Sequence, residues 1–240
     1  MNPLPLQSRV ILVTGAGSGL GRHAARAFAS QGASVLLLGR NERRLNAVYD
    51  DLVRAECPQP AVIPFDLAEA DEARFQALAQ MLEQQMGRLD GILHSASHFV
   101  KLGPLVQQHL KQWQPAFATN VFAPFALTQA CLPLLEAAPD ASVLFTAEEH
   151  GLNPAAYWGG FGVSNAALIA LVKIFADEFS NEPHLRFNVM VPGQVASPMR
   201  NRTHPGEVGS SLRQPASLME TYCYWMGPES TGRSGEIIRP

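Results

Sequence analysis

The sequence has few cysteines, almost no excess charge and no long uninterrupted apolar run. Its three cysteines, Cys57, Cys131 and Cys223, are scattered without metal-site spacing, so we expect buried, reduced thiols and no metal centre. A formal net charge of −3 gives no reason to expect a nucleic-acid partner. No apolar run reaches membrane-spanning length, and the first residues lack the apolar core of a signal peptide. We therefore expect a cytoplasmic protein that binds neither nucleic acid nor a membrane.

Length and hydrophobic content favour one domain over residues 1–240, because 240 residues with 47% hydrophobic side chains can form one substantial core. Short apolar runs predict strands at 10–14, 34–38, 61–65, 91–95, 142–146, 186–191 and 236–238. Helices are expected between them, at 19–31, 41–55, 71–86, 110–136 and 153–180. Pro115 predicts a break and Pro124 a kink, while Asn153 and Pro154 resemble an N-cap and a first-turn proline. The alternation predicts an α/β fold, a doubly wound parallel sheet of about seven strands with helices on both faces.

A glycine-rich turn follows the first predicted strand. Residues 10–21 read V-I-L-V-T-G-A-G-S-G-L-G, and a good helix former comes next. Such a turn lets the backbone approach a diphosphate, and the free N–H groups of the following helix attract the anion. The residues expected to contact a diphosphate here are Gly15, Ser18, Gly19, Leu20 and Gly21. The alternative is a tight strand-to-helix turn that binds nothing.

Two motifs at opposite ends of the chain resemble one family. The spacing T-G-x-x-x-G-x-G at 14–21 is similar to that of the short-chain dehydrogenase/reductase family. Residues 189–199, V-M-V-P-G-Q-V-A-S-P-M, resemble the family stretch that closes over the nicotinamide, with Pro192, Gly193 and Val195 in place. The resemblance spans nearly all of the chain. It implies a Rossmann-type fold and a nicotinamide dinucleotide as partner.

The end of the second predicted strand bears on the choice of cofactor. An acidic residue there would bond the adenosine ribose and favour NAD, whereas a basic residue meets the 2′-phosphate of NADP. Arg40 follows Gly39 at this place, so we expect NADP (NADPH) rather than NAD, the alternative being a solvated loop arginine. Asp66 and Leu67 end the third strand, where the family pattern implies an Asp that bonds the adenine; Asp66 could equally cap the next helix.

The fourth predicted strand ends in H-S-A-S at 94–97, where the family has N-N-A-G. Ser95 and Ala96 are expected to contact the cofactor. His94, Ser95 and Ser97 are bulkier than the family's turn, and we expect them to crowd the adenosine side.

The departure from the family is greatest at the catalytic positions. The family uses a Ser that orients the substrate oxygen, a Tyr that transfers the proton and a Lys that holds the ribose and lowers the Tyr pKa. The alignment places Glu148, Phe161 and Asn165 at these three positions. Asn120 matches the family's helix asparagine, which supports a relay water, and Asn165 could still bond a ribose hydroxyl.

Three functions remain open from the sequence. The first is an NADP(H)-binding protein with impaired catalysis; the second is an active NADP-dependent oxidoreductase on a small carbonyl or alcohol ligand, with Glu148 or Tyr157 as the acid. Tyr157 is expected on the same helix as Phe161, four residues earlier. The third is a structural oligomer without nucleotide. Residues 203–217 are a candidate mobile lid, and the resemblance implies a homodimer or homotetramer that pairs the helices at 110–136 and 155–180.

Overall fold

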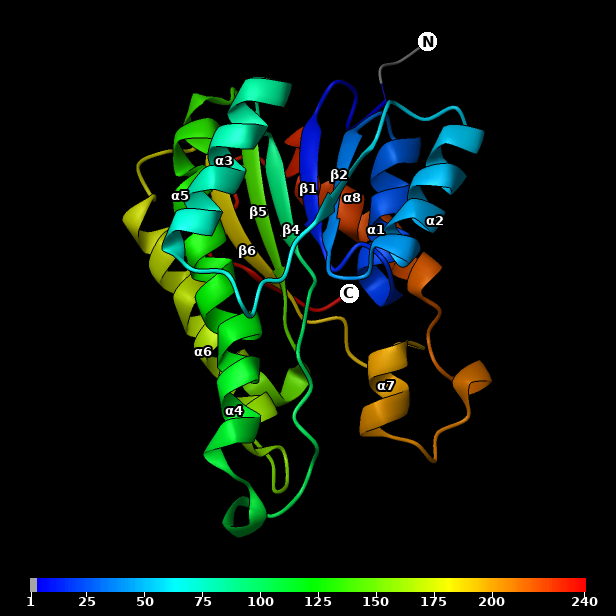
Figure 1. Cartoon of the computed structure of the whole chain (residues 1–240), viewed down its shortest axis with the longest axis vertical. Helices are drawn as coiled ribbons and strands as arrows, with labels where there is room; N and C mark the ends of the chain where they lie inside the picture. The colour runs from blue at the N-terminus through cyan, green and yellow to red at the C-terminus, as the bar shows by residue number, and fades with distance from the viewer. Residues whose placement is uncertain (1–3) are drawn as a thin grey trace.

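A single parallel sheet organises the computed structural model, which describes residues 4–240 (Figure 1). Within that part of the chain, seven strands pair in the order β3-β2-β1-β4-β5-β6-β7. Their bounds are β1 Val10–Thr14, β2 Ser34–Gly39, β3 Ala61–Pro64, β4 Gly91–His94, β5 Ala141–Thr146, β6 Leu185–Met190 and β7 Ile237–Ile238. The predicted α/β fold with a doubly wound sheet is confirmed.

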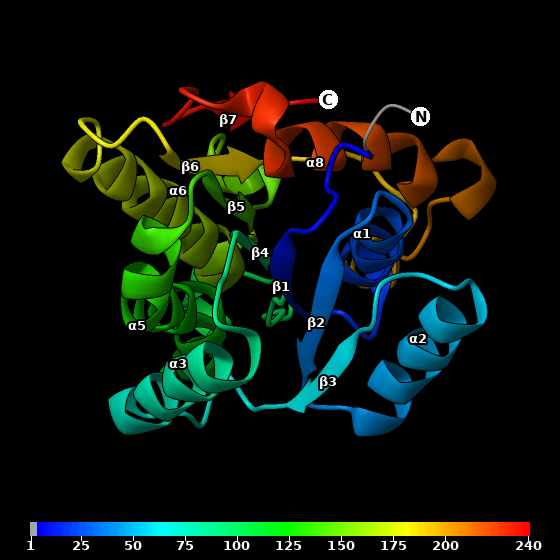
Figure 2. The same ribbon diagram turned by 90° about the horizontal axis from the view of Figure 1, so that it is seen from above.

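Helices cover both faces of the sheet (Figure 2). One face carries α1 Gly19–Ser30, α2 Glu42–Arg54 and α8 Met219–Met226. The other carries α3 Glu72–Met86, α5 Ala123–Ala137 and α6 Gly159–Glu178, with α4 Leu110–Phe117 leading into α5. Helix α7, Pro198–Thr203, lies beyond the carboxyl ends of the strands (Figure 1).

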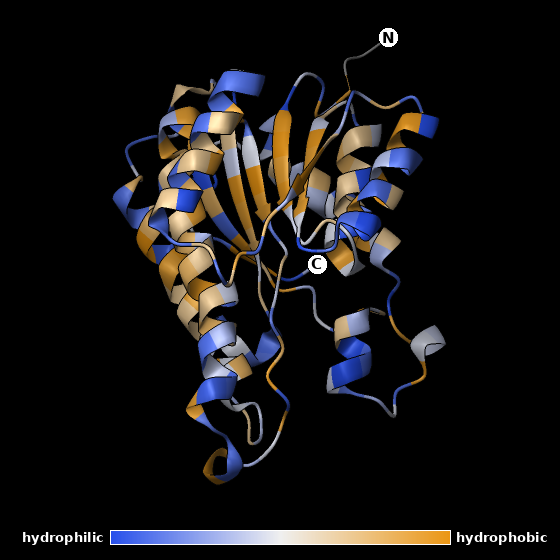
Figure 3. Ribbon diagram, viewed as in Figure 1, coloured by the Kyte–Doolittle hydropathy of each residue, from blue (hydrophilic) through white to orange (hydrophobic). Residues whose placement is uncertain are grey.

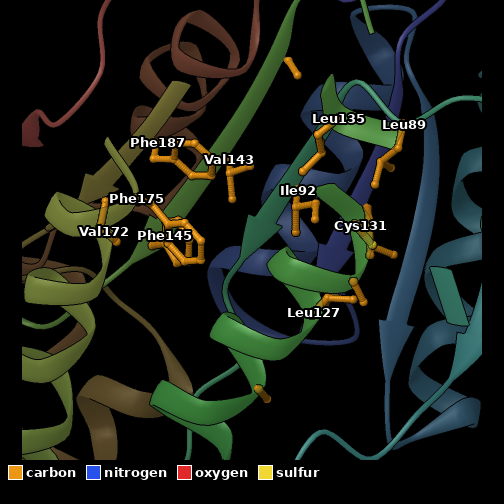
Figure 4. Close-up of a cluster of buried hydrophobic side chains, with 14 of the residues drawn as sticks. Leu89, Ile92, Leu127, Cys131, Leu135, Val143, Phe145, Val172, Phe175 and Phe187 are labelled. Atoms are coloured by element: carbon orange, nitrogen blue, oxygen red, sulfur yellow. The ribbon is translucent and has the colours of Figure 1, made fainter. Parts of the chain in front are cut away.

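Alternating side chains of the strands enter two separate cores. In β1, Val10 and Leu12 join the core under α3, α5 and α6, whereas Ile11 and Val13 join the core under α1, α2 and α8. The first core includes the stacked rings of Phe175 and Phe187, whose centroids lie 5.1 Å apart (Figure 4). Since both faces are covered, the strands are mostly apolar (Figure 3), as is typical of buried parallel strands, although β6 also carries the buried Arg186 and Asn188.

The helix at 110–137 departs from the expected break. Helix α4 continues through Pro115 to Phe117, so the break predicted at that proline is wrong. A π-helical turn, Ala118–Phe122, then joins α4 to α5. Pro124 lies just after this turn and has no N–H to donate to the carbonyl of Asn120, and the wider turn accommodates the missing bond.

The predicted start of the helix at 153–180 is also wrong. Helix α6 begins at Gly159 with Trp158 as N-cap. The Asn153 side chain bonds back to Glu149 rather than capping a helix ahead of it. Tyr157 has a φ of +76°, a left-handed conformation that ends any helix before it. Tyr157 therefore does not share a helix with Phe161.

Two helical stretches, Leu110–Ala137 and Gly159–Glu178, are long and apolar enough to cross a membrane by length and composition alone. About half of each apolar window, 50% and 56%, is buried inside the fold. Packing against the sheet accounts for their apolar character.

A cluster of ion pairs ties the amino ends of the central strands together. Arg186 in β6 is fully buried and bonds Asp140 at 2.5 Å, while Arg9 bonds the other oxygen of Asp140 at 2.5 Å. Burial alone would raise the pKa of Asp140, but the hydrogen bond and charge of Arg186 outweigh it and lower the pKa to about 2. The folded state therefore favours the ionised form of the Asp140 carboxyl group.

Because of this cluster, we expect the free energy of unfolding to depend on pH below about 4. Because the folded pKa of Asp140 lies below its ordinary value, the carboxylate stabilises the fold fully above about pH 4, and this contribution is lost as pH falls towards about 2. We expect a loss of about 2 kcal/mol in the free energy of unfolding from this group over that range. Urea unfolding at pH 7, 4 and 2.5 measures it. Asp140→Asn should flatten the dependence relative to the exposed Asp177→Asn, and equal slopes in both variants would contradict the assignment.

Candidate functional site

A cavity of about 440 Å³ opens at the carboxyl edge of the sheet. The strand order reverses between β1 and β4, and the loops that leave these strands part there. The predicted site residues that line it are Gly15, Ser18, Gly19, Leu20, Arg40, Asp66, Leu67, Ser95, Ala96, Glu148, Phe161, Asn165, Pro192, Gly193 and Val195. Gly21 and Asn120 lie outside the lining.

The glycine turn is fixed by close contact with the turn after β4. Thr14 Oγ1 accepts bonds from the backbone N–H groups of Ser95 at 3.0 Å and Ala96 at 3.1 Å. Gly15 has a φ of +68°, and a Cβ on it would lie 2.9 Å from the Ala96 backbone. A Cβ on Gly21 would lie 2.6 Å from the Gly15 carbonyl oxygen. Gly21 therefore packs helix α1 against the turn, behind the surface that faces the cavity.

Two glycines leave open space along the cavity wall, where a dinucleotide could lie against the backbone. A Cβ on Gly19, at the start of α1, would find its nearest atom 3.8 Å away at Pro198, so space is open above the helix N-terminus. Gly193, at the opposite wall, has open space within 4 Å of its Cβ direction among the described residues. The first turn of α1 also lacks acidic residues, within its bounds Gly19–Ser30, and so leaves the positive end of the helix dipole free for an anion.

Arginines gather at the end of the cavity beside β2. Arg40 approaches Asp66, with 3.8 Å between Nη1 and Oδ2, and its side chain stays 66% exposed. Asp66 also accepts from the backbone N–H of Ala68 at 2.9 Å, so it caps a turn and lines the cavity at once. Arg44 lines the same wall, and the sequence reasoning did not single it out. The Asn41 N-cap was a signal for it, because the cap places residue 44 in the first turn of α2.

At the other end, Asn165 connects the three positions of the family's catalytic groups. Its amide oxygen accepts from the Glu148 N–H at 2.8 Å, and its amide nitrogen donates to the Phe161 carbonyl at 2.9 Å. The Asn165 side chain is buried, with 4% of the residue exposed. The Glu148 carboxylate accepts from His150, from its backbone N–H at 2.6 Å and from Nδ1 at 2.8 Å. Both polar atoms of the Asn165 side-chain amide are thus hydrogen-bonded to backbone groups of the protein.

Phe161 belongs to an aromatic cluster beside the cavity. Its ring meets Phe99 edge-on at 5.4 Å between centroids and lies 6.1 Å from Trp158. Val100 and Met199 pack in the same cluster, and only 2% of Phe161 is exposed. Of this cluster, Phe161 and Met199 line the cavity, and the ring of Phe161 carries no exchangeable proton.

The side-chain amide of Asn120 forms hydrogen bonds within the protein through both its oxygen and its nitrogen. Its Oδ1 accepts from the His98 N–H at 2.7 Å, and its Nδ2 donates to the His98 carbonyl and to Ser164 Oγ, both at 3.0 Å. Ser97 Oγ lies a further 3.4 Å from Oδ1. Asn120 therefore anchors the chain after β4, and its amide groups are engaged rather than free for a relay water.

Two further expectations are corrected by position. Tyr157 is 60% exposed and lies outside the cavity lining, so it is not placed to act as an acid there. His94 is buried on the opposite side, stacked on Phe145 at 4.6 Å and bonded to Thr128, and burial lowers the pKa of His94 to about 3. It cannot crowd a nucleotide; of the three residues expected to do so, Ser95 and Ser97 line the cavity.

Helix α7 forms the outer wall of the cavity. Ser197 caps α7, and Arg200 makes a two-pronged ion pair with Glu207 at 2.5 and 2.6 Å. Arg200 and Arg202 both line the cavity, which the sequence reasoning did not foresee. The candidate lid at 203–217 is thereby tied to α7 by an ion pair.

A parallel sheet with a glycine turn after its first strand and a cavity at the reversal of strand order defines a Rossmann-type dinucleotide-binding protein. The sequence model described as short chain dehydrogenase matches residues 9–207. The chain belongs to the short-chain dehydrogenase/reductase family.

Relatives of this chain include proteins solved with a cofactor. The oxidoreductase YciK of Escherichia coli K12 is 37% identical over 96% of this chain and 90% of its own length. A short chain dehydrogenase of Shigella flexneri 2a strain 301, complexed with NADP, shares 36% identity and 99% coverage of both chains at a TM-score of 0.95. One from Escherichia coli CFT073, complexed with NADPH, shares 36% identity over 100% of this chain and 99% of that one, at a TM-score of 0.95.

Proposed function

We propose that the protein binds NADP(H) and has lost the reductase chemistry of its family. The observation that carries the proposal is the cavity end around Phe161, where a buried phenyl ring stands at the position of the tyrosine and a neutral amide at that of the lysine. Hydride transfer to a carbonyl puts negative charge on oxygen, and a positioned acid must neutralise it. Phe161 has no proton to give, and Asn165 has no charge.

A second candidate function is an active oxidoreductase in which Glu148 is the acid. Glu148 lines the cavity, and its contact with His150 offers a route for protons. The substrate would be a small carbonyl or alcohol. Turnover of the wild type distinguishes the two functions, as described in the Discussion.

Binding itself is supported by the glycine turn, the open helix N-terminus and the arginines of the β2 wall. The cofactor is proposed to be NADP(H) rather than NAD(H), because Arg40 stands where an acidic residue would otherwise bond the ribose. Guanidinium groups present several donors to a phosphate. The two related proteins complexed with NADP and NADPH support the same choice. Titration of the purified protein with NADPH and NADH, followed by fluorescence, tests it.

Replacement of Arg40 by Ala is expected to weaken NADP(H) by about 1–3 kcal/mol, the range of a charge-assisted hydrogen bond, and to leave NAD(H) nearly unchanged. The dissociation constants of both cofactors measure the effect. Arg43→Ala is the matched control, because Arg43 neighbours the site on α2 without lining the cavity. Equal losses for both cofactors in Arg40→Ala would sink the assignment, as would the absence of binding at millimolar concentration.

We also propose a cytoplasmic homodimer or homotetramer and a mobile lid at 203–217. The helical face of α5 and α6 presents exposed apolar side chains, which two copies could bury: Phe122, Phe125, Val163 and Ile174. The Arg200–Glu207 ion pair would hold the lid against α7, and the lid would close over bound nucleotide.

A further inference from the structure

The end of the cavity beyond β5 carries a charge opposite to the one that the family pattern implies. That pattern has a lysine cation at the position of Asn165, whose amide is neutral and bonded to the backbone. It has an uncharged serine at the position of Glu148, whose carboxylate lines the cavity with 21% of its side chain exposed. One positive charge is lost and one negative charge is gained.

Among the described residues, no arginine or lysine forms an ion pair with this carboxylate. Glu149, next to it, pairs with Arg239 at 3.3 Å. Across the cavity, Arg200 is paired with Glu207, and the Arg202 guanidinium lies over the Phe99 ring, 4.6 Å from its centroid. His150 is the one basic side chain within 4 Å of the Glu148 carboxylate in the described chain.

The two redox forms of the cofactor differ in charge at one end only. NADP⁺ carries a positive nicotinamide ring, and hydride addition makes the ring neutral, whereas the phosphates and adenosine are the same in both forms. The stretch Pro192–Val195, which resembles the family's nicotinamide cover, follows β6, and Glu148 follows the neighbouring strand β5. Pro192, Gly193 and Val195 line the same cavity as Glu148. A carboxylate at this end therefore attracts the oxidised form alone.

We infer that the cavity binds NADP⁺ more tightly than NADPH, and that the Glu148 carboxylate makes the difference. This rests on the proposed binding of NADP(H). Two opposite unit charges close together near a protein surface interact strongly enough to change a dissociation constant by about tenfold or more. With no acid to drive turnover, the bound state would follow the oxidation state of the NADP pool, and the protein would act as a redox-sensitive binding module.

The test is calorimetric titration of the full chain with NADP⁺ and, separately, with NADPH. Wild type is expected to bind NADP⁺ more tightly, and Glu148→Gln should lower the ratio of the NADPH to the NADP⁺ dissociation constant by about tenfold. Glu148→Ser, the family's residue, should do the same and serves if the glutamine variant does not fold. Glu178→Gln is the control, because it removes a carboxylate at the far end of α6, about 20 Å along the helix from Asn165.

The outcomes separate the two proposals. An unchanged ratio in both folded Glu148 variants overturns the inference while binding stands. Tighter binding of NADPH than of NADP⁺ by wild type also overturns it. Failure of both redox forms to bind at millimolar concentration overturns the proposed function itself.

Discussion

The purified wild-type protein is expected to oxidise NADPH with a panel of aldehydes and ketones at least about 10²-fold more slowly than ordinary enzymes, which turn over at about 1–10³ s⁻¹. The loss of a positioned acid alone accounts for about 10²–10⁴ in rate. The missing serine hydroxyl and lysine charge add to the deficit, although such effects are not additive. Absorbance of NADPH under steady-state conditions measures the rate.

Restoration of the three groups together is expected to raise that rate above wild type. The change is Glu148→Ser, Phe161→Tyr and Asn165→Lys, which removes a carboxylate and supplies a phenol and a cation on the frame that β5 and α6 provide. Phe161→Tyr alone is the matched control and should gain little, because no lysine lowers the pKa of the new phenol. Wild-type turnover on the order of 1 s⁻¹ would refute the loss of catalysis. Glu148→Gln would then show whether that carboxyl is the acid.

The second large effect is expected at the opposite edge of the sheet. Arg186→Ala should lower the free energy of unfolding by about 3–5 kcal/mol, because it removes one of the two arginines paired with Asp140 and leaves a cavity where a fully buried side chain stood. Arg186 also donates to Ser230 Oγ at 2.9 Å and to the Gly227 carbonyl at 2.6 Å, and both would lose a donor. Denaturant unfolding followed by circular dichroism measures the loss.

The control for this change is Arg233→Ala. Arg233 forms a salt bridge with Glu236 at 3.1 Å, but its side chain is 45% exposed, so its loss should destabilise the fold far less than the loss of Arg186. A similar, small loss in both variants would show that the buried cluster does not hold the strands together.

The strands could be predicted from sequence because a buried parallel strand is a short, contiguous and mainly apolar run of residues. Runs such as 10–14 are apolar throughout, and turn residues end them at one edge. No such sequence pattern marks the start of α6. Asn153 and Pro154 have the composition of a helix start, yet the Asn153 side chain bonds backwards and Tyr157 turns left-handed. The residue types of a helix start therefore do not distinguish a side chain that bonds backwards from one that caps the helix ahead of it.

The site residues also fall into two groups: those that sequence motifs indicated and those that only the folded chain brings to the cavity. The glycine turn, Arg40 and the three altered catalytic positions belong to contiguous motifs, so the sequence indicated them as a group. Arg202 could not be predicted, because only the folded chain brings α7 to the cavity, whereas the Asn41 N-cap was a signal for Arg44. The engaged amide of Asn120 was hidden for the same reason, since its partners at His98 and Ser164 lie on other elements or turns.

The bond between the Asn165 amide and the Glu148 N–H has an evolutionary consequence. A lineage that regained lysine at position 165 by one substitution would leave that N–H without its acceptor, at a cost of about 1–3 kcal/mol. It would gain no activity in return, because Phe161 would still lack a proton. On the proposed loss of catalysis, lysine at position 165 would restore function only together with a proton donor at position 161 and a new acceptor for the Glu148 N–H. A single substitution to lysine would therefore lower stability without a gain in activity.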